Sequence, residues 1–505
     1  MKIIRRLSMI FSFFAILFSF LARWLLNTWG NISMEGIVFH LKVPLTGTSN
    51  EYIYGFILNV LIPTFILYII IYIFIFLILK NYLIFEIIIK KINKKIYFNL
   101  FGIHSKIYYQ VVFLLSIFII NISLGYVIGK LDIKEYLKNQ MTNSPFIEEN
   151  YINPDDVNLI FPKNKQNLIY IFLESMESSY TDIENGGVME ENLIPNLTKL
   201  YKKNISFSNN EKLGGALNMT GSTWTIGAMV AQTSGVPLKL PIDGNSYGKN
   251  QAFLKGITTL GDILKENGYN QYIIMGSDSN FAGRKGYFKQ HGNYEIFDVY
   301  TAIKEEKMNE FDRVWWGFED VDLYEWSKEK LLMLSSKEEP FNFTLLTADT
   351  HAEDGWLSDS CEVKYDDQYS NVISCADKQI SDFINWIKKQ DFYKNTTIVI
   401  VGDHLTMDFD FFEEKDVNYQ RTIYNTFINS KVATENNVNR LFSSYDLFPT
   451  TLASMGVKIE GNKLGLGVNL FSDEKTIIEK YGYSYVLNEL NKKSNFYNDN
   501  FLYVK

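Results

Sequence analysis

Cysteine is nearly absent from this chain, since Cys361 and Cys375 are the only two among 505 residues. Neither has a second cysteine two to four positions away, the spacing that structural zinc sites use, so a zinc module of that kind is excluded. An excess of basic residues is also lacking, because the formal net charge is −8. The composition therefore gives no indication of nucleic-acid binding.

Charge is missing from three long stretches near the N-terminus. Residues 52–79 and 107–129 contain no charged side chain, and residues 7–22 contain none before Arg23. Stretches of this length can cross the hydrocarbon core of a bilayer, and an arginine near a helix end can reach the head groups. We predict three transmembrane helices, at about 7–29, 52–79 and 107–129.

A cleaved signal peptide is the alternative for the first stretch. Cleavage needs small residues after the apolar run, and Arg23, Trp24 and Trp29 stand there instead. A retained anchor is therefore favoured.

Basic residues are distributed unevenly around the predicted helices. Three precede the first helix, and six lie between the second and third, where Glu86 is the one acidic residue. Because cytoplasmic loops carry the excess of lysine and arginine, both basic segments are predicted to be cytoplasmic, and everything after about residue 131 extracytoplasmic. The basic residues are Lys2, Arg5, Arg6, Lys80, Lys90, Lys91, Lys94, Lys95 and Lys106.

Both cysteines fall in the predicted extracytoplasmic part, 14 positions apart. An oxidising compartment favours disulfide formation. We therefore predict that Cys361 and Cys375 close a loop as a disulfide, with two free buried thiols as the alternative.

Four apolar runs in the second half of the chain each end at residues that can bind a metal or a phosphate. Near-continuous apolar runs are typical of parallel strands buried on both faces, and open α/β sheets bind ligands beyond the carboxyl ends of their strands. The residues that follow the runs are thus expected at one edge of one sheet. Run 168–173 is followed by Glu174, and run 272–275 is followed by Ser277, Asp278 and Arg284. Run 341–346 is followed by Asp349 and His351, and run 397–401 is followed by Asp403 and His404.

Taken singly, these residues carry little information, since a lone acidic residue or histidine after a strand is usually a capping or solvated group. Only three histidines occur after residue 131, however, and two of them, His351 and His404, follow predicted core strands. An Asp, a Glu and a neutral imidazole form a hard oxygen and nitrogen ligand set that suits Mn²⁺, Mg²⁺ or Zn²⁺ and leaves room for a further ligand.

Helical patterns lie between the predicted strands, at 194–201, 257–266, 376–388 and 445–455. Alternating strands and helices predict a doubly wound α/β fold. We divide the chain into a transmembrane region (1–131), a polar linker (132–165), a catalytic domain (166–475) and a C-terminal tail (476–505) without an assigned role.

A turn rich in glycine and hydroxyl residues, within 213–232, runs into a helical pattern. A hydroxyl at a helix N-terminus sits among free backbone N–H groups that favour an incoming phosphate, and coordination to a divalent cation lowers its pKa. Capping of the helix is the alternative role, and the two can coexist.

Together these motifs resemble the phosphoglycerol transferases that modify periplasmic glucans, relatives of lipoteichoic acid synthase in the alkaline phosphatase/sulfatase-like superfamily. The resemblance covers roughly residues 166–470, and it implies a doubly wound sulfatase-like sheet domain after a three-helix membrane region. It is carried by residues 221–232, 234–238 and Pro241, with Glu174 before them and with 281–284, 349–351, Asp403 and His404 after them.

The resemblance also implies a metal and a nucleophile. Glu174, Asp403 and His404 match metal ligands, and the expected cofactor is Mn²⁺, with Mg²⁺ as a substitute. Alignment through the family's Trp and Gly-Val-Pro places Ser222 at the position of the nucleophile, where most relatives carry threonine, and its hydroxyl would be a further metal ligand. Thr223, one residue along, is the alternative nucleophile.

The donor pocket is implied in the same way. Arg284 and His351 match residues that hold the lipid's phosphate and glycerol, and His351 is a candidate proton carrier. Met275, Ser277 and Ala282 stand where the polymer-forming synthases carry His, Asp and Trp, which favours the glucan-modifying branch. Sulfatase activity is not expected, because the Pro and Arg that formylglycine maturation requires do not follow Ser222.

The implied function is transfer of phosphoglycerol from phosphatidylglycerol to a periplasmic or cell-surface glycan, through a covalent phosphoglyceryl-enzyme and with release of diacylglycerol. The implied location is a bacterial inner membrane, with the catalytic domain on the periplasmic side. The alternatives are a phosphoethanolamine transferase with the same metal site, a hydrolase that passes the group to water, and a membrane sensor without chemistry.

Overall fold

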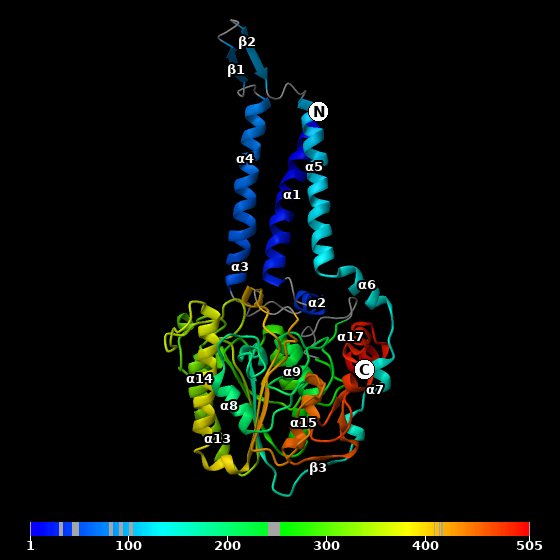
Figure 1. Ribbon diagram of the computed structural model, residues 1–505, viewed down its shortest axis with the longest axis vertical. Helices are drawn as coiled ribbons and strands as arrows, with labels where there is room; N and C mark the ends of the chain where they lie inside the picture. Colours follow the sequence, from blue (N-terminus) through cyan, green and yellow to red (C-terminus); the bar gives the residue numbers. More distant parts are fainter. Residues whose placement is uncertain are drawn as a thin grey trace. The chain divides into compact units, whose positions relative to one another are not determined.

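The computed structural model describes residues 2–29, 34–42, 50–79, 84–89, 94–99, 105–240, 253–408, 410–413, 415 and 418–503 (Figure 1). The chain divides into two compact units. Residues 1–31 and 49–135 form the first, and residues 32–48 and 136–505 form the second.

The first unit contains three helical spans that are long and apolar enough to cross a membrane, over Lys2–Thr28, Ile53–Leu77 and Ile107–Lys130. They confirm the three predicted stretches. The elements are α1 (Lys2–Trp29), α3 (Asn50–Phe56) continued by a π-helical turn (Ile57–Leu61) and α4 (Ile62–Leu79), and α5 (Ser105–Lys130).

The segment between the second and third spans includes an antiparallel pair of strands, β1 (Ile84–Ile89) and β2 (Lys94–Asn99). Of the lysines used to orient the chain, Lys80, Lys90 and Lys91 lie outside the described residues.

The second unit is built on a six-stranded sheet with the order β6-β5-β7-β4-β8-β9. The four predicted strands are its four interior strands, they pair in parallel, and together they confirm the expected α/β fold. The edge strand β9 runs antiparallel to β8, which the sequence did not indicate. The strands are β4 (Asn167–Leu173), β5 (Asn270–Met275), β6 (Glu295–Phe297), β7 (Phe341–Leu346), β8 (Thr396–Gly402) and β9 (Asn425–Ile428).

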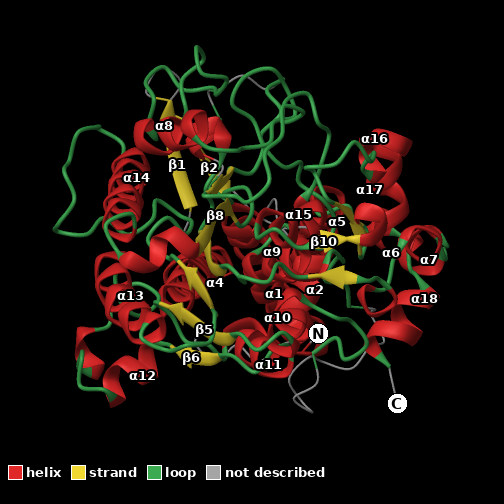
Figure 2. Ribbon diagram, turned by 90° about the horizontal axis from the view of Figure 1, so that it is seen from below, coloured by secondary structure: helices red, strands yellow, loops and turns green. Residues whose placement is uncertain are grey.

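Helices cover both faces of this sheet (Figure 2). Side chains alternate across a strand, so Leu168, Tyr170 and Phe172 of β4 enter one apolar core and Ile169 and Ile171 enter the other. The first core includes α9 (Thr225–Ser234), α10 (Leu260–Glu266), α11 (Arg284–Gln290) and α15 (Leu447–Ser454); the second includes α8 (Pro195–Lys203), α12 (Val299–Lys304), α13 (Asp320–Ser335) and α14 (Gln368–Ile387). Burial on both faces explains why the strands read as continuous apolar runs.

Residues 136–165 and 476–505, which the sequence analysis divides off as a linker and a tail, fall in this unit. Phe146, Ile147, Ile477, Val486 and Phe501 are buried in the same apolar core. Short helices carry most of these residues, and each buries its few apolar side chains against segments distant in sequence, which no local pattern reveals. The elements are α6 (Ile133–Met141), α7 (Phe146–Asn150), α16 (Ile477–Tyr481), α17 (Tyr483–Asn491) and α18 (Asn495–Tyr497), with β3 (Leu159–Ile160) paired to β10 (Lys458–Ile459).

A short helix from the N-terminal third also belongs to the second unit. In α2 (Met34–Lys42), Phe39 is buried and its ring centroid lies 5.7 Å from that of Trp224. Trp224 directly precedes α9, and the first residue of this helix lies in the candidate active site.

Candidate active site

Three ionisable side chains converge where β4 and β8 end. Glu174 follows β4, and Asp403 and His404 follow β8, which is the neighbouring parallel strand. All three are buried, and each contributes a possible ligand atom, with these atoms within 4.8 Å of one another. The sequence predicted this convergence, and the pairing of Leu173 with Gly402 at the ends of the two strands accounts for it.

Backbone contacts orient two of these side chains toward the centre of the cluster. Asp403 Oδ1 accepts hydrogen bonds from the backbone N–H groups of Ser175 and His404, both at 2.7 Å. His404 Nδ1 lies 2.8 Å from the carbonyl oxygen of Leu405, which assigns the proton to Nδ1 and directs the Nε2 lone pair inward. Nε2 lies 3.4 Å from Glu174 Oε1 and 3.4 Å from Asp403 Oδ2.

This cluster fits a divalent cation. Asp403 Oδ2 is buried and has no hydrogen-bond partner, a costly arrangement unless another group satisfies the oxygen. Burial and the charge of Glu174 raise the pKa of the Asp403 carboxyl to about 8. A bound cation would coordinate the free Oδ2 of Asp403 and stabilise the carboxylates of Asp403 and Glu174. The oxygen and nitrogen donors of Glu174, Asp403 and His404 suit such an ion.

A hydroxyl stands beside the cluster at the start of α9. Thr225 is the first residue of this helix, and its Oγ1 lies 3.3 Å from Glu174 Oε2 and 3.5 Å from His404 Nε2. The backbone N–H groups of the first helical turn have no partner within the helix, and they attract anions such as phosphate. A hydroxyl group and the backbone N–H groups of a helix start are therefore combined at Thr225.

The structure places the two predicted nucleophiles elsewhere. Ser222 is fully buried, and its hydroxyl donates to the carbonyl oxygen of Met219 at 2.9 Å. Thr223 is half-buried in the same turn, also before the helix begins. The alignment through Trp224 therefore points three positions upstream of the hydroxyl that reaches the cluster. The helical pattern of the sequence starts directly after Trp224, and this start could have indicated Thr225 as the hydroxyl residue at the helix N-terminus.

The turn before α9 requires glycine. Gly221 has φ of +70°, and a Cβ there would lie 2.7 Å from the backbone nitrogen of Leu238, which donates to the Gly221 carbonyl. Farther along α9, the Gln232 amide donates to the carbonyl oxygens of Gly402 and Asp403, at 3.0 and 3.2 Å. These contacts fix the helix against the end of β8, and hence fix Thr225 against the cluster.

Arg284 begins α11 and is buried beneath the loop that follows β5. Its guanidinium donates to the carbonyl oxygens of Asp278 and Phe281, at 2.8 and 3.2 Å. Burial lowers its pKa to about 10, while the charge of Glu174 acts in the opposite direction. Arg284 thus stays protonated at neutral pH, as a fixed cation close enough to interact with Glu174.

His351 lies on the loop after β7. Its Nδ1 is 2.8 Å from the carbonyl oxygen of Ala352, an arrangement that leaves Nε2 as a proton acceptor. Burial lowers the pKa of His351, although the Glu174 charge partly offsets this. The ring is therefore neutral near pH 7 and able to take a proton.

Trp316 is a candidate site residue that no sequence motif indicated. Its ring centroid lies 4.7 Å from that of His351 and 5.2 Å from that of Phe281, and the Phe281 ring in turn lies under the Arg284 guanidinium. Trp316 comes from the loop before α13, so it connects two sides of the site. The one sequence feature that could have indicated Trp316 as a site residue is the pair of adjacent tryptophans, Trp315 and Trp316, in a loop.

The two cysteines form a disulfide in the structure, with a Cα separation of 5.5 Å. Cys375 lies in α14, and Cys361 lies in the loop that connects His351 to that helix. The bond therefore restrains the chain that follows the His351 loop.

Comparison with known proteins identifies a family and several related proteins. The family model described as Sulfatase matches residues 166–457, more than half of the chain. Phosphoglycerol transferase I proteins from Salmonella paratyphi B and Salmonella typhimurium are each 34% identical to it over 286 residues, or 55% of this chain and 35% of the relative. The match thus spans about a third of the length of these curated relatives.

Solved structures are also similar. A protein of the alkaline phosphatase superfamily from Vibrio parahaemolyticus aligns with a TM-score of 0.50 at 20% identity, over 70% of this chain and 81% of that one. A lipoteichoic acid synthase from Listeria monocytogenes aligns with a TM-score of 0.49 at 18% identity, over 65% of this chain and 82% of that one. The sheet order, the residues at the strand ends and the family match lead to one conclusion: the chain belongs to the sulfatase family, with the fold of the alkaline phosphatase superfamily.

Proposed function

We propose that this protein is a membrane-anchored phosphotransferase that moves phosphoglycerol from phosphatidylglycerol to a glycan hydroxyl, with Thr225 as its nucleophile. The observation that carries the proposal is the Thr225 hydroxyl at the start of α9, next to Glu174 and His404 of a buried ligand set. Similarity to phosphoglycerol transferase I supports the choice of phosphoglycerol as the transferred group.

Glu174, Asp403 and His404 would hold the metal, with Mn²⁺ as the expected ion. When bound, a divalent cation would supply Lewis-acid activation of the Thr225 hydroxyl and of the phosphoryl oxygens. A metal-ligand role for the hydroxyl is thus assigned to Thr225 in place of Ser222.

In the first half-reaction, Thr225 Oγ1 attacks the phosphorus of the lipid. The new bond joins Oγ1 to phosphorus, the bond from phosphorus to the diacylglycerol oxygen breaks, and the hydroxyl proton ends on diacylglycerol. Arg284 stabilises the charge on the phosphoryl oxygens, and the N-terminus of α9 adds partial positive charge. The protein is left with a phosphoglyceryl group on Thr225.

In the second half-reaction, a glycan hydroxyl attacks the same phosphorus and Thr225 leaves. His351 Nε2 accepts the proton of the glycan hydroxyl and returns one to Thr225, which restores the starting state. The predicted membrane spans keep the domain near its lipid donor and so raise the donor's effective concentration. We propose that the domain faces the extracytoplasmic side of a bacterial inner membrane.

Intact-mass spectrometry of the purified full-length protein tests this function. Incubation with Mn²⁺ and phosphatidylglycerol, without an acceptor, should give one phosphoglycerol adduct, whereas phosphatidylethanolamine should give none. A phosphoethanolamine adduct formed from phosphatidylethanolamine would instead support the phosphoethanolamine transferase. Release of glycerol phosphate without transfer to added glycan would indicate a hydrolase, and no reaction with either lipid would favour the sensor.

A further inference from the structure

The indole ring of Trp316 packs against the imidazole ring of His351. Their centroids lie 4.7 Å apart, with an angle of 52° between the ring planes. His351 Nδ1 lies 2.8 Å from the carbonyl oxygen of Ala352, and this contact holds one atom of the ring. Rotation of a histidine ring about its last side-chain bond has a broad energy profile, so one hydrogen bond does not fix the ring plane. The contact with Trp316 supplies a second restraint.

Trp316 stands on a tight turn that is fixed to the sheet. Within the turn, the N–H of Val314 donates to the carbonyl oxygen of Gly317 at 3.0 Å, and the N–H of Gly317 donates to the carbonyl oxygen of Val314 at 2.8 Å. A Cβ at Gly317 would lie 2.0 Å from the carbonyl oxygen of Gly276, directly after β5. The same carbonyl oxygen accepts from the N–H of Phe318 at 2.9 Å. This close approach requires glycine at position 317 and places the turn at the end of β5.

Hydrogen bonds join the loop of Trp316 to the loop of His351. The Asp320 carboxyl group accepts from the backbone N–H groups of Ala348 and Asp349, at 2.9 and 3.1 Å. The Asp349 carboxyl group accepts from the backbone N–H of Asp320 at 3.1 Å. These residues lie close to the two rings along the chain, so the fold itself brings the indole and the imidazole together.

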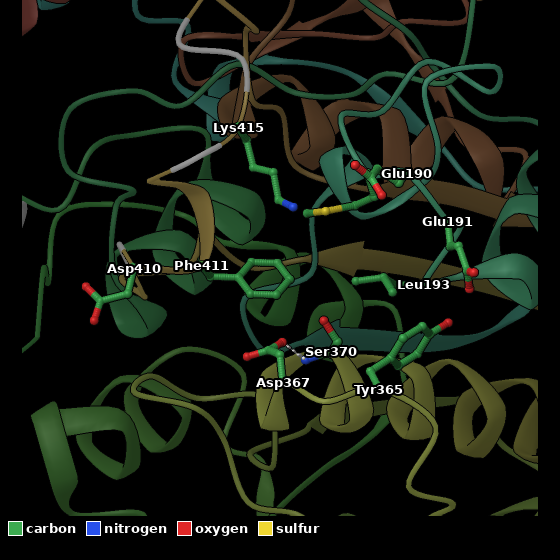
Figure 3. Close-up of a pocket in the computed structure, with 10 residues that line it drawn as sticks. Glu190, Glu191, Leu193, Tyr365, Asp367, Ser370, Asp410, Phe411 and Lys415 are labelled. Atoms are coloured by element: carbon green, nitrogen blue, oxygen red, sulfur yellow. Dashed lines mark hydrogen bonds between the residues drawn. The ribbon is translucent and has the colours of Figure 1, made fainter.

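The start of α14 also holds the loop after β7. Asp367 caps this helix, and its carboxylate accepts a hydrogen bond from the backbone N–H of Ser370 at 2.7 Å (Figure 3). The hydroxyl of Tyr369, in the first turn of α14, lies 2.9 Å from the carbonyl oxygen of Thr350. These contacts act on the backbone of the loop, whereas Trp316 acts on the imidazole ring.

Trp316 also reaches the side of the site that contains Arg284. Its ring centroid lies 5.2 Å from that of Phe281, and the Phe281 centroid lies 5.4 Å from Arg284 Cζ. The indole therefore contacts His351 directly and is linked to Arg284 through another ring. In the proposed mechanism, His351 acts on the attacking glycan hydroxyl and Arg284 acts on the phosphoryl oxygens, so the two routes affect different steps.

We propose that Trp316 is a positioning residue that orients the His351 imidazole for the second half-reaction. The inference rests on the proposed function. In that step the glycan oxygen bonds to phosphorus as the bond from phosphorus to Thr225 Oγ1 breaks, while His351 Nε2 takes the glycan proton and returns one to Thr225. Such a transfer needs an aligned acceptor within hydrogen-bond distance, and a ring that rotates freely is aligned less often. Trp316 itself exchanges no proton.

Separate rates for formation and loss of the adduct test this proposal in the detergent-solubilised full-length protein. The adduct is formed with Mn²⁺ and phosphatidylglycerol. Its loss is followed by intact-mass spectrometry after removal of lipid and addition of a glucose oligosaccharide as the probe acceptor. Trp316→Leu should change the rate of formation by less than about threefold and slow the loss by roughly 10- to 100-fold. Equal slowing of both rates would overturn the proposal.

Two further variants serve as references. Trp316→Phe keeps an aromatic ring against His351 and should restore the rate of loss to within about fivefold of the wild type. Trp315→Leu removes the neighbouring indole, whose centroid lies 6.4 Å from that of Trp356, and should leave both rates unchanged. Equal effects of Trp315→Leu and Trp316→Leu would assign the change to the turn as a whole and refute the specific role of Trp316.

Combination with His351→Gln shows whether Trp316 acts through the imidazole. His351→Gln alone should slow the loss at least as much as Trp316→Leu does, and the double variant should be no slower than His351→Gln. Additive effects would mean that Trp316 contributes independently of His351, which contradicts the proposal. The melting temperature of each variant checks its fold.

The chemical reactivity of His351 gives a result that needs neither lipid nor acceptor. Diethyl pyrocarbonate modifies neutral imidazole nitrogens, and peptide mapping identifies the histidine that reacts. Release of the ring in Trp316→Leu should increase modification of His351 severalfold, with Trp315→Leu as the reference. An unchanged reactivity would refute the positioning role. Absence of the adduct in the wild-type protein would instead count against the proposed function, and the reactivity would still decide whether Trp316 restrains the ring.

Discussion

The Thr225 hydroxyl donates to the Glu174 carboxylate at 3.3 Å, although 51 positions separate the two residues. Glu174 directly follows an interior strand, and Thr225 starts a helix that packs on the same sheet. The pairing gives Thr225 a defined position beside Glu174, which is why we propose Thr225 as the nucleophile in place of Ser222.

Substitution of the hydroxyl residues tests this assignment. Thr225→Ala should reduce formation of the phosphoglycerol adduct by roughly a thousandfold or more, because no other group supplies the attacking oxygen. Thr225→Ser should keep measurable activity, and Ser222→Ala should still form the adduct. Peptide mapping of the adduct identifies the modified residue. An adduct on Ser222 or Thr223 would refute Thr225 as the nucleophile.

Asp403→Asn should weaken metal binding by roughly 10- to 100-fold or more, because the change removes a charged ligand whose Oδ2 has no other partner. The metal content after dialysis against trace Mn²⁺, measured by inductively coupled plasma mass spectrometry, reports metal binding independently of turnover. Asp391→Asn, at a fully exposed position, is the control. Equal metal content in both variants would contradict the assigned ligand set.

The carboxyl groups of Asp320 and Asp349 should make stability depend on pH. Burial raises the pKa of both, and for Asp349, whose pKa is raised to about 9, the charge of Asp320 adds to the effect. An acid with a raised pKa in the folded state holds its proton more tightly there than in the unfolded chain. Its contribution to stability is present at low pH and is lost as the pH rises toward 9.

Asp349→Asn removes this titration, while the amide oxygen can still accept from the backbone N–H of Asp320. The difference in apparent melting temperature, variant minus wild type, should therefore become more positive between about pH 6 and pH 9, by roughly 2 °C or more. A difference that stays constant over this interval would mean that the pair is not protonated in the folded protein.

The disulfide should stabilise the unit that contains Cys361 and Cys375. Closure of a 14-residue loop lowers the entropy of the unfolded chain, and this effect is worth roughly 3 kcal/mol of unfolding free energy. Urea denaturation of Cys361→Ser/Cys375→Ser should show this loss. A reductant should destabilise the wild-type protein and leave the double variant unaffected; the same response in both would assign the effect to the reductant itself.

The orientation of the membrane unit can be tested with reporter fusions. A reporter that is active only outside the cytoplasm should work when it is fused after Asp132, because the basic residues place that position across the membrane. The same reporter fused between the second and third helices should be inactive. The opposite pattern would reverse the proposed topology.

The sequence by itself determined the four interior strands, the three long apolar helices and the grouping of Glu174, Asp403 and His404. Each has a local cause: an interior strand buried on both faces must be apolar throughout, and so must a helix in lipid. Glu174, Asp403 and His404 could then be grouped from one rule, that parallel strands end at the same edge of a sheet.

Only the tertiary structure decided which hydroxyl reaches that edge. Ser222, Thr223 and Thr225 lie within four positions, and their order along the chain does not reveal where α9 starts or which way the turn points. Packing decides it, because the contact of Gly221 with Leu238 and the hydrogen bonds of Gln232 to the end of β8 set the position of the helix. The burial of Phe146, Ile147, Ile477, Val486 and Phe501 was likewise decided by contacts between distant segments. Short helices bury their few apolar side chains only against partners that the chain brings together when it folds.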